Sequence, residues 1–137
     1  MPLPSLELTR SEWIVLKAVW RREPCTAPGI QEELHQATGW TYSTVRTLMD
    51  RMVAKGILQA EKLRNLTLFR SQVTRAQAQQ SELLYALKHA FDGALTPMVQ
   101  HLIETNDLAE SDLAEIEELI SAKREANRRS RREKGAK

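Results

Sequence analysis

Residues 41–58 read TYSTVRTLMDRMVAKGIL, and this stretch has the pattern of one helix with two chemically different faces. Its apolar residues recur at intervals of three and four, which places them on a single stripe of the helix. Thr41 or Ser43 can cap the helix at its start, Lys55 suits the negative end of its dipole, and Gly56 can take the left-handed conformation that ends it. The apolar stripe consists of Val45, Leu48, Met49, Met52 and Val53.

The opposite face of this predicted helix carries short hydroxyl groups and guanidinium groups. Such groups reach phosphates and base edges when the start of a helix enters the major groove of DNA. We therefore predict a DNA recognition helix. The alternative is an amphipathic core helix with a polar outer side, and this stretch alone does not separate the two. The predicted DNA contacts on the helix are Ser43, Thr44, Arg46, Thr47 and Arg51.

Two shorter helical patterns precede this stretch. Thr9 and Glu12 have the spacing of a capping box, and the apolar residues that follow predict a helix over about residues 10–22. Thr26 is expected to cap a second short helix with Pro28 in its first turn, where a missing N–H is tolerated. We interpret the three tryptophans as anchors of the core and of the helix contacts. They are Trp13, Trp20 and Trp40.

After Gly56 the apolar period changes from that of a helix to that of a strand, and two short strand-like segments meet near Arg64-Asn65. Asparagine tolerates a positive φ, so Asn65 is the candidate for the tight-turn position. Three helices followed by a two-stranded hairpin form a winged helix-turn-helix, in which the hairpin is the wing. We predict that the wing contacts the DNA backbone, and the alternative is a solvated basic turn. The cations on or near the wing are Lys62, Arg64 and Arg70.

From Thr74 onward the pattern is helical again. Thr74 and Gln77 have the spacing of a second capping box, and three amphipathic helices are predicted up to about residue 122. Three apolar faces in fewer than about 55 residues do not easily bury themselves in a monomer. We infer an all-helical dimerisation region, and the alternative is three helices folded back onto the winged domain.

Charge is segregated along the chain, although the net charge is only +2. Residues 1–75 carry 11 Lys and Arg against 7 Asp and Glu, residues 76–122 carry 1 against 9, and residues 123–137 carry 8 against 2. Because positive charge attracts phosphate and negative charge repels it, we expect the middle segment to face away from nucleic acid. The last segment, KREANRRSRREKGAK, has no core-forming apolar residue and is predicted to be disordered. It is either a solvated tail or a source of salt-sensitive affinity for DNA.

These patterns predict a mainly α fold in four parts: a flexible arm at residues 1–8, a winged-helix DNA-binding domain at 9–74, a helical dimerisation domain at 75–122 and the basic tail at 123–137. No segment is apolar enough to span a membrane and no secretory signal is visible, so we expect no membrane insertion. The single cysteine fits a reducing cytosol. Isolated histidines and the lack of nucleophile or phosphate-loop motifs predict no metal site, no cofactor and no enzyme.

In this order of elements the chain resembles the penicillinase-repressor group of transcriptional regulators, of the BlaI, MecI and CopY type. The resemblance covers most of residues 9–122. It implies a cytoplasmic bacterial repressor that binds a palindromic operator as a homodimer, with the third helix in the major groove and the wing, including Arg64 and Arg70, along the backbone. The motifs that carry it are Ser11-Glu12-Trp13 and Trp20, Trp40, and Thr44-Val45-x-Thr47-Leu48-x-x-Arg51-x-x-x-Lys55-Gly56-x-Leu58.

The resemblance also implies a mode of control and shows three departures. Similar repressors are inactivated when a membrane-bound sensor protease cuts the dimerisation region, and the corresponding bond here is His101-Leu102, where the family usually has a different pair. The wing tip has Leu63-Arg64-Asn65 in place of the usual glycine, so we expect a longer turn or a different geometry. The C-terminal cysteine cluster of the copper-responsive branch is missing, which excludes copper sensing through it. The alternative function is a winged-helix module that docks proteins without sequence-specific DNA binding.

Overall fold

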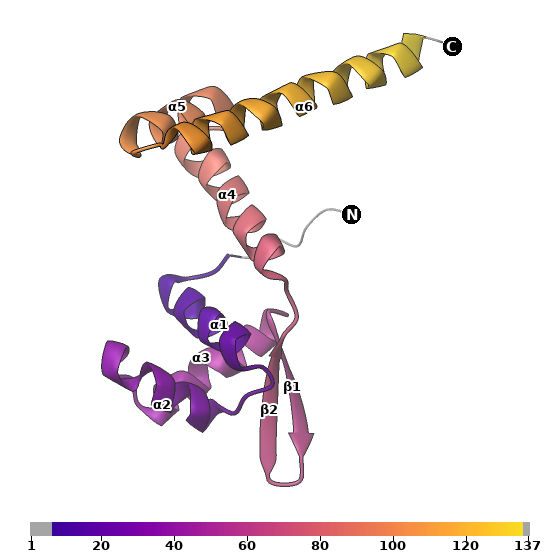
Figure 1. The fold of residues 1–137 in the computed structure, drawn as a ribbon. Coiled ribbons are helices and arrows are strands. Elements are labelled where there is room, and N and C mark those ends of the chain that lie inside the picture. The colour runs from indigo at the N-terminus through magenta and orange to yellow at the C-terminus, as the bar shows by residue number, and fades with distance from the viewer. Residues whose placement is uncertain (1–6, 136–137) are drawn as a thin grey trace. The chain divides into compact units, whose positions relative to one another are not determined.

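The computed structural model describes residues 7–135, which form six helices and one two-stranded antiparallel sheet (Figure 1). The chain divides into two compact units, residues 1–90 and 91–137. The elements of the first unit are α1 Arg10–Arg22, α2 Ala27–Thr38, α3 Tyr42–Ala54, β1 Leu58–Leu63, β2 Leu66–Ser71 and α4 Arg75–Phe91, whose last residue begins the second unit. The second unit continues with α5 Leu95–Thr105 and α6 Glu110–Gly135. These elements confirm the predicted mainly α winged-helix fold followed by a helical region.

Side-chain caps begin the first three helices where the sequence predicts them. The Thr9 hydroxyl accepts a hydrogen bond from the Glu12 N–H at 3.2 Å, and the Glu12 carboxylate accepts one from the Thr9 N–H at 2.9 Å, which completes the capping box. Thr26 and Thr41 cap α2 and α3 by accepting from the backbone three residues later. These hydrogen bonds satisfy N–H groups that have no partner inside the helix. The helix starts predicted at Thr9 and Thr26 are therefore confirmed, and of the two caps predicted for α3, Thr41 or Ser43, the structure has Thr41.

The core of the first unit lies between α1, α2, α3 and the base of the hairpin. The apolar stripe of α3 is buried there, apart from the half-buried Val53, and the three tryptophans pack half-buried around its edge. The Trp20 indole donates a hydrogen bond to the Ser71 hydroxyl at 3.0 Å, which joins α1 to the end of β2. The stripe of α3 is thus core, and the tryptophans are the anchors that the sequence predicts. The largest fully buried core side chains include Leu16, Ile30, Met49, Met52, Ile57 and Phe69.

The hairpin pairs β1 with β2 from Leu58 opposite Ser71 to Leu63 opposite Leu66. This register leaves a turn of two residues. Two residues is the common length of a tight hairpin turn. Asn65 occupies the second position of this tight turn, as predicted, but the residue with positive φ is Arg64, at 56°. The favoured two-residue hairpin turns have a positive φ at their first central residue, and the register places Arg64 there.

A short bridge attaches the hairpin to the loop between α1 and α2. The Cys25 N–H donates to the Phe69 carbonyl at 3.1 Å, and the Phe69 N–H donates to the Cys25 carbonyl at 2.7 Å. Both residues are buried. The base of the wing is therefore fixed to the helical core, while its tip projects beyond it (Figure 1).

Helix α4 packs on the winged-helix unit in its first half. Its predicted capping box is present, because the Gln77 N–H donates to the Thr74 hydroxyl and the Thr74 N–H donates to the Gln77 side chain. Ala78 is buried in the core, and the Arg75 guanidinium lies 4.6 Å from the centre of the Trp20 ring. These contacts are in keeping with the division into compact units, which falls after residue 90. The sequence predicts a domain boundary at residues 74–75.

In the second unit α5 and α6 bury little of their apolar surface, and Met98 is the one buried hydrophobic residue among its described residues. The apolar side chains of this unit are largely solvent-exposed. Those with exposed fractions of 39–70% are Leu95, Val99, Leu102, Ile103, Leu119 and Ile120.

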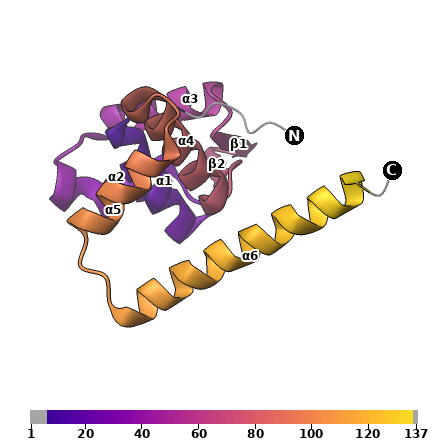
Figure 2. The same cartoon turned by 90° about the horizontal axis from the view of Figure 1, so that it is seen from above.

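Helix α6 runs without interruption to Gly135 (Figure 2), so the prediction that residues 123–137 are disordered is wrong as far as residue 135. The start of α6 supplies the helical nucleus, and adding residues to a formed helix is favourable. Alanine, glutamate, lysine and arginine, which dominate the basic segment, are strong helix formers. Glu125 also lies 3.6 Å from Arg128 and from Arg129, at helical spacing. Residues 136–137 lie outside the described part of the chain.

The predicted flexible arm falls mainly on residues 1–6, which lie outside the described residues. Its last two residues are attached to the first unit. Leu8 packs against the core, and the Glu7 carbonyl accepts a hydrogen bond from the Lys55 ammonium at 3.3 Å.

Candidate nucleic-acid interface

Four of the five predicted helix contacts share one exposed surface of α3. The helix period brings them to the side opposite the buried stripe. Together with Ser11, Trp40 and Leu48 they line a shallow depression of about 290 Å³. The structure therefore brings hydroxyl groups and one guanidinium together around a concave surface. These four residues are Ser43, Thr44, Thr47 and Arg51, and all are exposed.

Arg46, the fifth predicted helix contact, lies apart from this depression. Its guanidinium pairs with the Asp50 carboxylate at 3.2 Å and lies 5.5 Å from the centre of the Phe69 ring in β2. Burial opposes the charged form, but hydrogen bonding to Tyr42 and the charge of Asp50 outweigh it, so the pKa of Arg46 is raised. Arg46 is therefore a charged group already held between α3 and the wing. Asp50 was not among the predicted residues, although its spacing of four from Arg46 is that of an ion pair on a helix.

The wing cations do not form a single surface. Opposite residues in an antiparallel pair point to the same face, and neighbours along a strand alternate. Lys62 pairs with Thr67 and shares the face of Phe69, toward which Arg46 is directed, whereas Arg70 pairs with Gln59 on the other face. Arg64 lies in the turn at the tip, and all three cations are exposed. The structure thus brings Lys62 to the same side as Arg46 and separates it from Arg70.

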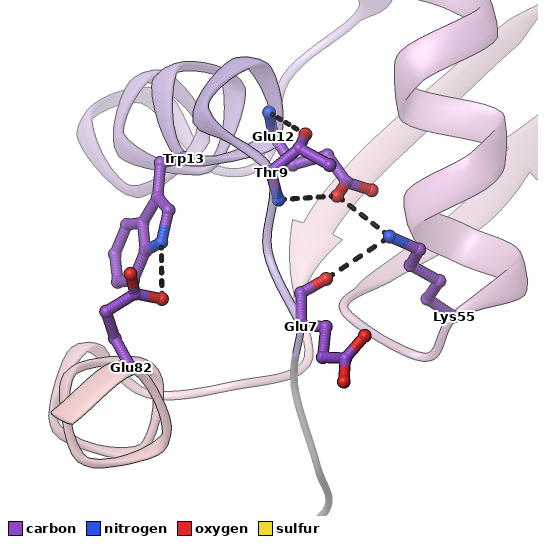
Figure 3. A network of polar contacts seen from close by, with 6 residues as sticks. All are labelled: Glu7, Thr9, Glu12, Trp13, Lys55 and Glu82. Carbon is purple, nitrogen blue, oxygen red and sulfur yellow. Dashed lines mark hydrogen bonds and ion pairs between the residues drawn. The ribbon is translucent and has the colours of Figure 1, made fainter. Parts of the chain in front are cut away.

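An ion pair between a buried carboxylate and a partly exposed ammonium fixes the end of α3 to the start of α1 (Figure 3). The Lys55 ammonium lies 2.8 Å from a carboxylate oxygen of Glu12, a side chain that is 0% exposed. Burial alone raises the pKa of Glu12, but hydrogen bonds from Lys55 and Thr9 outweigh burial, so the net pKa lies below the ordinary value. The sequence pattern indicates only a place near the end of the helix dipole for Lys55. The pair spans 43 residues, and no local spacing identifies such a partner.

The predicted cleavage bond lies inside α5. The His101 carbonyl accepts a hydrogen bond from the Thr105 hydroxyl at 2.6 Å, and the Leu102 carbonyl accepts one from the Asn106 side chain at 2.6 Å. Both residues are exposed, and the His101 ring lies 5.8 Å from the Phe91 ring. The bond is therefore at the surface of the second unit but in helical conformation.

The described residues contain no group of three or more metal-ligating side chains. The Cys25 thiol is buried and weakly acidic. Burial raises the pKa of the Cys25 thiol to about 11, so the thiol stays protonated at neutral pH. Across residues 7–135, every helix is too short or too polar to cross a lipid bilayer.

The fold and this surface define a winged-helix protein whose third helix presents an exposed face of hydroxyl groups and arginine. The profile of the penicillinase repressor family matches residues 8–122, and the chain belongs to that family. The family takes its name from the penicillinase repressor. Residues 123–137 lie beyond the matched region.

Several relatives can be compared with this chain. The methicillin resistance regulatory protein MecI of Staphylococcus aureus is 23% identical over 117 residues, which cover 85% of this chain and 95% of the relative. The penicillinase repressor of Bacillus licheniformis is 19% identical over 114 residues, which cover 83% and 89%. Among solved structures, monomeric BlaI of Bacillus licheniformis in complex with the blaP half-operator is similar, with 19% identity, a TM-score of 0.48, and coverage of 53% of this chain and 89% of that chain.

Proposed function

We propose that this chain is a cytoplasmic transcriptional repressor that binds a palindromic operator in double-stranded DNA as a homodimer. The observation that carries the proposal is the exposed face of α3, where Arg51 stands beside three hydroxyl side chains without an ion pair of its own among the described residues. A free guanidinium on a helix can donate two parallel hydrogen bonds to a guanine edge or to a phosphate. Membership of a repressor family supports the same function.

In the proposed complex α3 enters the major groove and the wing follows the DNA backbone. Ser43, Thr44 and Thr47 are short enough to let the helix approach the groove closely. Lys62, Arg64 and Arg70 supply positive charge for phosphates on or near the wing, with Lys62 and Arg46 on one side of the hairpin. A dimer with two-fold symmetry presents two such surfaces, which is why its operator is palindromic.

Selection of bound DNA from a random pool, followed by salt titration, tests DNA binding. We expect enrichment of a palindromic site and a steep fall in affinity for any duplex as salt rises, because bound cations release counterions from phosphate. A module that only docks other proteins gives no enriched sequence and little duplex binding at any salt concentration. That second result would exclude the proposed function.

The second unit supplies the proposed dimer interface. Its α5 and α6 leave six large apolar side chains exposed, and a groove of about 530 Å³ lies between them, lined mainly by Leu95, Val99, Ile103 and Ile120. Exposed apolar patches of this kind on a soluble protein mark interaction surfaces. A second copy of the same unit would cover them and hold two recognition surfaces together.

Proteolytic release is the proposed mode of control, through a membrane-bound sensor protease acting at His101-Leu102. A cut there separates the first part of α5 from Leu102, Ile103 and all of α6. Because the bond is inside a helix, α5 must open locally before the bond can enter an extended protease site. The structural consequence of the cut is loss of most of the proposed interface.

A chain truncated after His101 should therefore be monomeric and should bind the selected operator more weakly than the complete chain does. Two linked half-sites gain affinity because the second contact is intramolecular, and a monomer does not have this gain. Analytical ultracentrifugation and operator titration measure both effects. A chain truncated after Ala122 is the matched control, because it keeps every large apolar side chain of the interface and should remain dimeric. A dimeric chain of residues 1–101 would contradict the assigned interface.

A further inference from the structure

The last part of α6 is a cationic helix outside the region that matches the family. Residues 123–135, here called the basic extension, carry seven Lys and Arg against two Glu. The family match ends at residue 122, and α3 and the wing lie within the matched region. We propose that the basic extension is a second DNA-binding surface, which holds the phosphate backbone without reading sequence. This inference rests on the proposed DNA-binding function and adds a separate site to it.

The helical period gathers the positive charge of the basic extension on one side. With 3.6 residues in each turn, six of its seven cations fall within about half of the helix circumference. Arg129 and both glutamates, Glu125 and Glu133, fall on the other half. The cationic half therefore contains no acidic residue, and Glu125 lies next to it, beside Arg128. Its members are Lys123, Arg124, Arg128, Arg131, Arg132 and Lys134, all exposed.

The cations of this half are mostly unneutralised. Arg128 has a long ion pair with Glu125, at 3.6 Å, and the other five form no ion pair among residues 7–135. Arg124 and Arg132 each lie four residues from Arg128, a spacing at which like charges repel on a helix. A polyanion that lies along this face would relieve the repulsion. The helix should therefore gain stability when phosphates bind to it.

The side chains favour nucleic acid over a lipid surface. Five of the seven cations are arginines, whose planar guanidinium groups bind phosphate oxygens in pairs. Residues 123–135 contain no large apolar residue, whereas helices that lie in a membrane surface insert an apolar face. Thirteen helical residues span about 20 Å, and duplex DNA carries one charge for about each 1.7 Å of its axis. Several phosphates therefore lie within reach of the extension.

The test compares two double variants of the complete chain. Arg131→Gln with Arg132→Gln removes two unpaired cations, and glutamine keeps the helix propensity. The matched control, Arg21→Gln with Arg22→Gln, removes two arginines that pair with Glu33 in the first unit. Affinity for one operator duplex and one random duplex of equal length is measured against salt concentration. Circular dichroism checks the helix content, and truncation after Ala122 provides a second way to remove the extension.

We expect the slope of log affinity against log salt to become shallower by about 0.9 for each phosphate that is no longer neutralised, so by about 1.8 for each copy of the extension variant. The decrease in affinity should be equal on both duplexes, which leaves the operator preference unchanged, and the control should keep the wild-type slope. An unchanged slope in the extension variant and in the truncated chain, with operator binding intact, would overturn this inference alone. Absence of duplex binding by the wild-type chain would overturn the proposed function as well.

Two other partners would give different results. If the extension bound a second copy of the chain, the variant dimer would dissociate more readily in ultracentrifugation without DNA. Its slope of log affinity against log salt would stay unchanged. If the extension bound a membrane surface, the wild-type chain would bind vesicles containing phosphatidylserine and the variant would not. The salt dependence of duplex binding would again be unchanged. Either result would overturn the assignment to DNA.

Discussion

Replacing Lys55 with alanine should lower the free energy of unfolding by about 2–3 kcal/mol, because it leaves the Glu12 carboxylate buried without its counter-ion. Breaking a fully buried pair costs about 3–5 kcal/mol, and we expect less here because solvent screens Lys55, whose side chain is 38% exposed. The change also releases the Glu7 carbonyl and loosens the end of α3 against α1. Denaturant unfolding followed by circular dichroism measures the decrease in stability.

A double-mutant cycle separates the charge from the packing of the two side chains. Lys55→Met keeps the aliphatic stem and should destabilise nearly as much as Lys55→Ala if the charge dominates. Adding Glu12→Gln to Lys55→Met removes the buried charge itself and should recover most of the stability. Equal stability of the wild type and Lys55→Met would show that the ion pair contributes nothing.

The same pair predicts how stability depends on pH. The pKa of Glu12 is lower in the folded protein than its ordinary value, so the folded state binds fewer protons as the carboxylate titrates. The contribution of the pair is therefore complete above the ordinary glutamate pKa and is lost as pH falls through the lower folded value. Stability of the wild type should fall more steeply over this acidic range than stability of Glu12→Gln. Parallel pH profiles would contradict this assignment.

Replacing Arg51 with alanine should weaken binding to the selected operator by about 1–3 kcal/mol and leave binding to a random duplex nearly unchanged. Arg51 is exposed beside the hydroxyl groups of α3 and need not break an ion pair to reach a base edge. Arg46 is held by Asp50 and lies over Phe69 next to the wing. We therefore expect Arg46→Ala to weaken both duplexes equally and by less, as for a phosphate contact.

Asp50→Asn is the matched control for this pair of arginines. It removes the one carboxylate on the polar face of α3 and frees the Arg46 guanidinium from its ion pair. The side chains of both arginines stay unchanged. Binding to both duplexes should strengthen, because a negative charge no longer faces phosphate. Fluorescence anisotropy at a single salt concentration compares all three variants. If Arg51→Ala affects both duplexes equally, Arg51 contacts phosphate, and if neither arginine matters, α3 is not the recognition helix.

The sequence predicts local structure well in this chain because its signals act over a few residues. The capping threonines form hydrogen bonds with groups three residues away, and the apolar stripe of α3 repeats with the helical period. The wing follows from the change of period after Gly56. These features identified the winged-helix fold and the hydroxyl-rich face of α3, and the resemblance to penicillinase repressors that they supported is confirmed by the family match.

Only the tertiary structure decided which charges meet across distant parts of the chain. Lys55 and Glu12 meet across 43 residues, and the hairpin register separates Lys62 from Arg70, so no local pattern reports either fact. The basic segment departs from its prediction for a related reason: its composition favours disorder, but the preceding turns of α6 let the helix continue. The stretch at residues 41–58 by itself determined a capped, two-faced helix. Contacts between elements decided that Arg51 stays available on its polar face while Arg46 is held against the wing.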